Sequence, residues 1–84
     1  MRIYMQTTPV DGKPPRFYHL HLQEDLLEGW TLVKESGYQG GSGKVIREYF
    51  TSRDDALDAL ITTRDRQVKR GYRMVFAQGE TVGD

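Results

Sequence analysis

The stretch Ser36-Gly37-Tyr38-Gln39-Gly40-Gly41-Ser42-Gly43 decides how the centre of this 84-residue chain folds. It holds four of the nine glycines and lies between two β-prone runs, Trp30–Val33 and Val45–Phe50. Glycine accepts positive φ and a close approach of backbone, so the stretch predicts a loop that joins two antiparallel strands. Such a loop can also expose its amides for binding.

Alternating and β-prone residues predict the other strands. In the run 16–23, Tyr18, Leu20 and Leu22 point to one face, while Phe17, His19 and His21 point to the other. The segment 8–15 contains three prolines and a glycine, which predict a turn-rich connection before this run. The five expected strands are Arg2–Thr8, Arg16–Gln23, Trp30–Lys34, Lys44–Phe50 and Tyr72–Ala77.

After the fourth strand the apolar period changes to that of a helix. Its expected buried face recurs at steps of three and four residues. Ser52 is the expected N-cap, two aspartates follow in the first turn, and Gly71 is the expected stop. The helix should therefore run from about Arg53 to about Arg70. Its face is Leu57, Leu60, Ile61, Arg64 and Val68, and the expected core is Trp30, Leu32, Leu57, Leu60 and Ile61.

These elements predict one α+β domain over residues 1–77, with a flexible tail over 78–84. Its architecture is an antiparallel sheet of about five strands with one long helix packed on one face. The length allows one small core, and a composition with 37% apolar residues is typical of a globular protein. The chain has no cysteine, no signal-like start and no membrane-spanning run, so we expect a cytoplasmic protein without a membrane partner.

Charge is balanced overall but unevenly distributed. The net charge is zero, which argues against a strongly basic nucleic-acid binder. Residues 44–73 nevertheless hold eight Lys/Arg against five Asp/Glu, and the ten residues 64–73 hold five against one. Acids at the start of a helix and bases at its end also complement the helix dipole, so this polarity has a structural explanation beside a binding one.

Catalytic and metal sites find little support in the sequence. The glycine stretch lacks the spacing of a P-loop, and a strand rather than a helix follows it, which excludes a dinucleotide fingerprint. His19 and His21 share a strand face but have no evident third ligand. Asp54, Asp55 and Asp58 are explained by the helix start. We therefore expect a non-catalytic protein without a metal or another cofactor.

Several segments in one order resemble the WGR domain family. They are Phe17–Leu22, Gly29–Glu35, the glycine stretch, Phe50 before Ser52, Asp55-Ala56 and Lys69-Arg70-Gly71-Tyr72. The family includes short bacterial stand-alone proteins, parts of molybdate-regulator-like proteins, and a DNA-binding module of poly(ADP-ribose) polymerases. The resemblance covers about residues 1–76 and implies the same sheet and helix. The naming Trp-Gly-Arg triplet falls on Ser36-Gly37-Tyr38, where only the glycine is kept.

Two functions remain open from the sequence. The first is weak, sequence-independent DNA binding, in which Tyr38 stacks, basic residues contact phosphates and loop amides assist. Whether Tyr38 is exposed or folds back over the sheet is open. The second is a protein-interaction or scaffolding module with a separately encoded partner, docked on the loop, on the histidine face or along an edge strand. The expected nucleic-acid-binding residues are Tyr38, Gly40, Gly43, Lys44, Lys69, Arg70 and Arg73.

Overall fold

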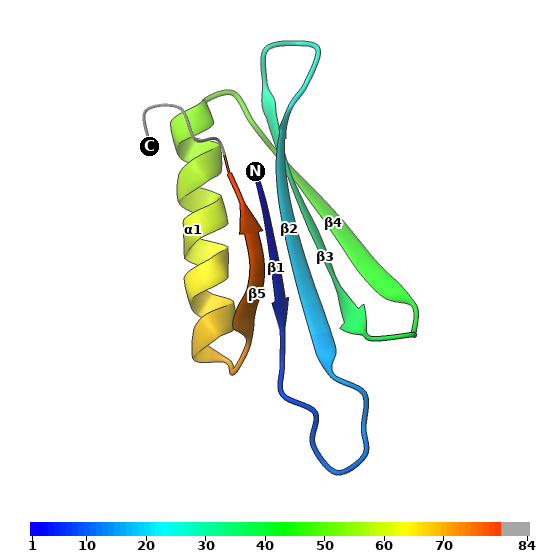
Figure 1. Ribbon diagram of the computed structural model, residues 1–84. Helices are drawn as coiled ribbons and strands as arrows, with labels where there is room; N and C mark the ends of the chain where they lie inside the picture. Colours follow the sequence, from blue (N-terminus) through cyan, green and yellow to red (C-terminus); the bar gives the residue numbers. More distant parts are fainter. Residues whose placement is uncertain (80–84) are drawn as a thin grey trace.

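The computed structural model describes residues 1–79 and contains one sheet and one helix (Figure 1). All neighbouring strands are antiparallel, in the order β4-β3-β2-β1-β5. The helix packs against β2, β3 and β4. The predicted α+β architecture is confirmed. The strands are β1 (Arg2–Gln6), β2 (Arg16–Glu24), β3 (Trp30–Tyr38), β4 (Gly43–Phe50) and β5 (Arg73–Gln78), and the helix is α1 (Arg53–Lys69).

The core lies between α1 and one face of the sheet. Leu20 and Leu32 are completely buried there, and Leu60 of α1 is 1% exposed. The alternation predicted for β2 is confirmed, since Leu20 and Leu22 lie in the core while His19 and His21 lie on the face without the helix. Trp30 and Leu57, expected in the core, pack against its margin. The buried apolar residues are Ile3, Met5, Leu20, Leu22, Leu32, Ala56, Leu60 and Tyr72.

Both ends of α1 follow the capping rules. The Ser52 hydroxyl accepts a hydrogen bond from the N–H of Asp55 at 3.3 Å, and two aspartates occupy the first turn. At the other end Gly71 has a φ of +103°, a left-handed conformation that glycine adopts without steric cost. The predicted helix bounds are therefore confirmed to within one residue.

The buried face of α1 differs from the prediction. Ile61 is 41% exposed and Val68 is 45% exposed, so both assignments to the core-facing side were wrong. The helix instead buries Ala56, Leu60, Thr63 and Gln67. Thr63 is compatible with burial because its hydroxyl donates to the Ala59 carbonyl at 2.8 Å, which leaves no unpaired donor. Small and polar residues thus occupy positions that the apolar pattern assigned to solvent.

Half of the glycine stretch is strand rather than loop, which corrects the prediction. Ser36, Gly37 and Tyr38 extend β3, and Gly43 begins β4, directly opposite Gly37. The turn is therefore confined to residues 39–42. Its only positive-φ glycine is Gly40, at +81°. Gly37 has no positive φ and instead allows a close approach of the two strands, because a Cβ there would lie 2.9 Å from the Ser42 carbonyl oxygen and 3.1 Å from Gly43 Cα.

The bounds of the first and last strands also differ slightly from the prediction. β1 stops at Gln6, since the prolines that follow cannot continue a hydrogen-bonded ladder. β5 includes Gln78, the first residue of the expected tail, and it carries a bulge where Val75 has no partner opposite Tyr4 and Met5. Residues 80–84 of that tail lie outside the described residues. Within residues 1–79 no helix has the length and apolarity that a membrane crossing requires.

Candidate nucleic-acid interface

One end of the domain gathers basic side chains from four parts of the chain. α1 ends here, β5 begins here, and the β1–β2 and β3–β4 connections turn here (Figure 1). All six of these side chains are exposed. We call this surface the basic end, and it consists of Lys13, Arg16, Lys44, Lys69, Arg70 and Arg73.

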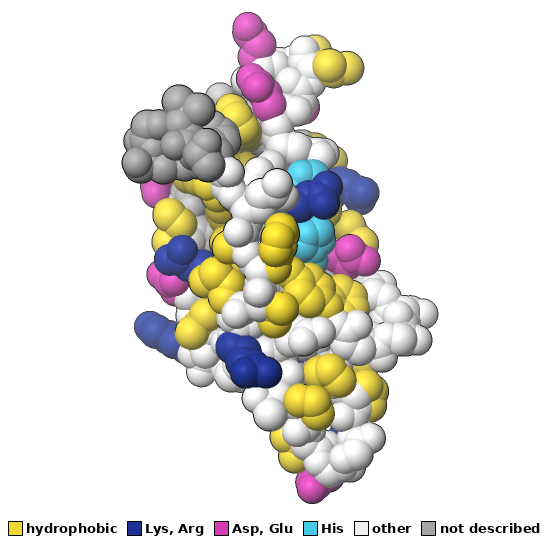
Figure 2. Space-filling model, viewed as in Figure 1, with side chains coloured by type: hydrophobic (Ala, Val, Ile, Leu, Met, Phe, Trp, Pro, Cys, Tyr) yellow, Lys and Arg dark blue, Asp and Glu magenta, His cyan; other side chains and the backbone are white. Residues whose placement is uncertain are grey.

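The opposite end is acidic. The β2–β3 connection carries Glu24, Asp25 and Glu28, and the first turn of α1 carries Asp54 and Asp55. Acidic side chains project at the upper end of the molecule in Figure 2. Each end also holds the other sign, Asp11 at the basic end and Arg2 and Arg53 at the acidic end, but the excess charge of the two ends is opposite in sign. A molecule of this kind has a basic surface that the net charge conceals.

Arg16 connects the parts of the basic end. Its guanidinium carbon lies 5.7 Å from the ring centroid of Tyr38 and 6.0 Å from that of Tyr72, within the range of cation–π attraction. Arg16 and Tyr38 are direct partners across β2 and β3. Tyr72 is tied to the end of α1, because its N–H donates to the Gln67 carbonyl at 3.0 Å. Arg16 was not among the residues predicted from the sequence, because its role depends on the register of this strand pair.

Tyr38 is partly exposed and partly covered, so it combines the two alternatives left open by the sequence, exposure and folding back over the sheet. Its ring lies under the Arg16 guanidinium, yet 51% of the residue stays exposed. A hollow of about 170 Å³ lies beside it, between the end of β3 and the 7–15 connection. Two cations, two hydroxyls and one aromatic ring are among the groups that line this hollow, a combination suited to phosphate and sugar contacts. Its lining is Thr7, Thr8, Val10, Lys13, Pro14, Arg16 and Tyr38.

The other predicted basic residues occupy the same end in different elements. Lys44 lies in β4 opposite Ser36, and Arg73 lies in β5 opposite Gln6. Lys69 is in the last turn of α1, where its charge also favours the helix dipole. Arg70 caps α1, with its N–H donating to the carbonyls of residues 66 and 67 at 3.2 and 3.0 Å. The strand pairing and the helix end thus fix the point from which each of these basic side chains extends into solvent.

The expected cradle of loop amides is partly occupied by the protein itself. The N–H of Gly41 donates to the Tyr38 carbonyl at 3.0 Å, and that of Gln39 donates to the Pro15 carbonyl at 2.9 Å. Gly43 belongs to β4 rather than to the loop. Gly40 lies at the turn, with open space around its Cβ position. Side chains rather than a nest of amides therefore supply most of the polar groups at this end.

The sheet face opposite α1 carries an aromatic row. The rings of Tyr4 and Phe17 stack with centroids 6.2 Å apart, and those of His19 and His21 stack at 6.3 Å. The histidines lie together, among hydrophobic, basic and acidic side chains (Figure 2). Across residues 1–79 no set of three His, Cys, Asp or Glu side chains is arranged to hold a metal ion. The row runs along β2 from Phe17, next to Arg16, to His21, which lies opposite Arg2.

His21 should make folding weakly pH-dependent. Burial, followed by the nearby positive charges of Arg2, the N-terminal amine and His19, lowers the pKa of His21 below its ordinary 6.5. The folded state therefore binds this proton less readily than the unfolded state. The free energy of unfolding should therefore be highest, as far as His21 is concerned, above the unfolded pKa. It should decrease as the pH falls from about 6.5 through the folded pKa.

This pH dependence can be measured on wild type and His21→Gln. We expect the melting temperature of the wild type to decrease from pH 7.5 to pH 5 by more than that of the variant. An NMR titration of the His21 ring should give a midpoint below 6.5. A midpoint at or above that value would contradict the assignment.

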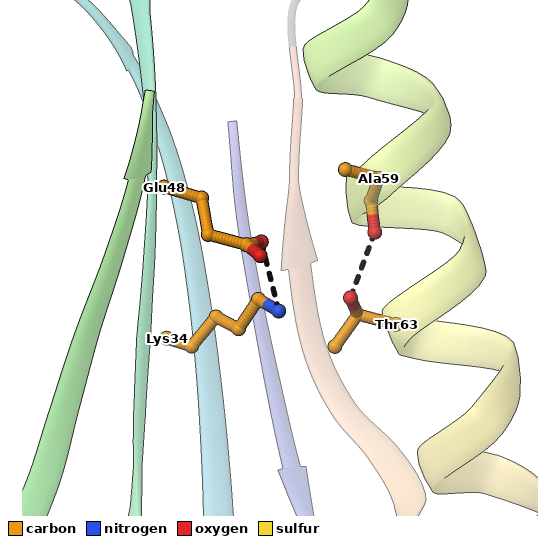
Figure 3. Close-up of polar contacts among 4 residues, drawn as sticks. All are labelled: Lys34, Glu48, Ala59 and Thr63. Atoms are coloured by element: carbon orange, nitrogen blue, oxygen red, sulfur yellow. Dashed lines mark hydrogen bonds and ion pairs between the residues drawn. The ribbon is translucent and has the colours of Figure 1, made fainter. Parts of the chain in front are cut away.

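A second hollow lies between α1 and the strands β3 and β4. It measures about 290 Å³ and contains an ion pair, Lys34 Nζ to Glu48 Oε1 at 2.8 Å. Both side chains project from the sheet toward α1, opposite the Thr63–Ala59 hydrogen bond (Figure 3). Asp58 and Arg66 also line it, so both charge signs are balanced within it. This groove has no excess charge that would favour a nucleic acid.

Searches of protein-family models, curated proteins and solved structures find no match to this chain.

Proposed function

We propose that the chain is a non-catalytic DNA-binding module that binds weakly and without sequence preference through its basic end. The separation of charge carries this proposal: Lys69, Arg70 and Arg73 lie at the same end as Tyr38 and Arg16, while acids lie at the other. Clustered cations attract phosphates, and an exposed tyrosine can stack on a base or sugar. Within residues 1–79 no helix projects as a groove reader, so contacts to the DNA backbone would dominate.

The resemblance to WGR modules also supports DNA binding at the basic end. Lys69 matches a basic position near the DNA in the polymerase modules. Ser36 and Tyr38 replace the aromatic and the cation of the family triplet. In this proposal Tyr38 supplies the stacking group, and Arg16, held 5.7 Å from its ring centroid, supplies the cation from the neighbouring strand. An aromatic and a cation are thus retained together, but on different strands.

The test is a titration of labelled blunt, nicked and single-stranded DNA at low and at moderate salt. For Lys69→Glu with Arg70→Glu we expect the affinity at low salt to fall by at least about tenfold, because two phosphate contacts become repulsive. If three or four phosphates are neutralised, the wild-type log affinity should fall with log salt with a slope of about −3.

A matched control is Arg2→Glu with Arg47→Glu on the open sheet face. Both double variants change the formal net charge from 0 to −4. The control should weaken binding far less, since it leaves the basic end intact. No binding of the wild type at low salt would overturn the proposal, as would equal losses in the two double variants.

A further inference from the structure

The two edges of the sheet differ in how they can accept another strand. β5 at one edge is bulged at Val75, and a bulge disrupts regular pairing. β4 at the other edge pairs with β3 without a register shift over all eight residues, from Gly43 to Phe50. It contains no proline, and its aliphatic residues Val45 and Ile46 are 45% and 42% exposed. An edge of this kind is a template for strand addition.

We propose that the outer edge of β4 pairs with β4 of a second copy of this chain, forming a two-fold dimer with a continuous ten-stranded sheet. A two-fold axis requires the same surface on both partners. Residues directly opposite one another must point to the same sheet face, whereas consecutive residues point to opposite faces. The residue at the two-fold axis must therefore pair with its own copy rather than with the copy of its neighbour. This leaves only a few registers to compare.

Charge selects one register among them. An axis at Lys44, Arg47 or Glu48 places that residue opposite its own copy, and like charges directly opposite are destabilising. An axis at Val45 places no opposite charges in direct pairs within the strand. An axis at Ile46 places Lys44 opposite Glu48 of the second copy, and does so twice because of the symmetry. The same register places Ile46 against Ile46 and Val45 against Arg47.

The surroundings of β4 are compatible with this register. Lys44 and Glu48 lie on the helix side of the sheet, as their pairing with Ser36 and Leu32 shows. Glu48 already accepts Lys34 at 2.8 Å, and its side chain is still 42% exposed, so it can accept a second cation. The groove of about 290 Å³ separates α1 from this part of the sheet. In the dimer both helices would lie on the same side, each behind its own groove.

The test is sedimentation velocity of the full chain without DNA, from about 10 µM to about 1 mM, the range in which small interfaces dissociate. Wild type should show a concentration-dependent monomer–dimer equilibrium. Lys44→Glu and Glu48→Lys each create two like-charge pairs, and each should raise the dissociation constant by at least about tenfold. The double exchange restores opposite charges between copies and should bring the constant back to within about threefold of wild type.

The control, Glu24→Lys, makes the same charge change as Glu48→Lys at the far end of an internal strand and should leave the equilibrium unchanged. Restoration by the double exchange cannot come from the Lys34–Glu48 pair, because the lysine introduced at position 48 still repels Lys34 in that variant. A monomer throughout the range would overturn the proposal. A dimer whose dissociation constant stays the same in both single exchanges would also overturn it. Such a result would indicate pairing through β5 or contact between the basic and acidic ends.

Discussion

Replacement of Leu60 by alanine should lower the free energy of unfolding by about 3 kcal/mol, within the range of about 2–5 measured for buried leucines. Leu60 is 1% exposed and lies with Leu20 and Leu32 in the single core between α1 and the sheet. Removing its isobutyl group loses apolar burial and leaves a cavity that a small domain cannot fill completely. Because whole domains are stable by only about 5–15 kcal/mol, this loss is large. Urea unfolding followed by circular dichroism would measure it.

Ile61→Ala is the matched control, since it removes an aliphatic side chain from the next position of the same helix. Ile61 is 41% exposed, so its truncation should cost less than about 1 kcal/mol. Both variants place alanine in the helix, and the propensities of leucine and isoleucine differ by only about a few tenths of a kcal/mol, so the difference between the variants reports mainly burial. Equal losses would mean that α1 is rotated toward the face expected from its apolar pattern.

The helix shows which parts of the fold could be predicted from the sequence. Its ends were predictable because Ser52 and Gly71 act locally, through one hydroxyl and one backbone conformation. Its buried face was predictable only in part, because Thr63 becomes acceptable in the interior through the hydrogen bond from its hydroxyl to the Ala59 carbonyl, which an apolar pattern does not reveal. An apolar pattern measures side-chain hydrophobicity, whereas the sheet selects residues that fit closely beneath it.

The candidate site was predictable in its position along the chain but not in its composition. Tyr38, Lys44 and Lys69 were expected from the glycine stretch, the charge pattern and the family resemblance. Arg16 was missed because it reaches Tyr38 only through the register of β2 and β3, a property of the folded sheet. The acid-to-base polarity of α1 was expected from the sequence. The acids of the β2–β3 connection, and Lys13, Arg16 and Lys44, join the two ends of α1 only when the strands are paired.

Replacement of Gly37 by alanine should lower the free energy of unfolding by about 2 kcal/mol, within the range for overpacking. A Cβ at this position would lie 2.9 Å from the Ser42 carbonyl oxygen and 3.1 Å from Gly43 Cα. Both are backbone atoms, so the hairpin itself would have to move. The Phe17 ring, 3.5 Å away, would be in ordinary van der Waals contact with the new methyl group. This close packing explains why the glycine is present without any need for positive φ. Thermal and urea unfolding would measure the loss.

Gly41→Ala is the control in the same hairpin. Its Cβ would meet the Tyr38 carbonyl oxygen at 3.5 Å, an ordinary contact, and its φ is not in the left-handed region. We expect a change within about 0.5 kcal/mol, which is usual for surface substitutions. If Gly37→Ala is as stable as Gly41→Ala, the close approach of β3 and β4 is not as described. If Gly37→Ala folds but binds DNA less well, the position of the hairpin that carries Tyr38 contributes to binding.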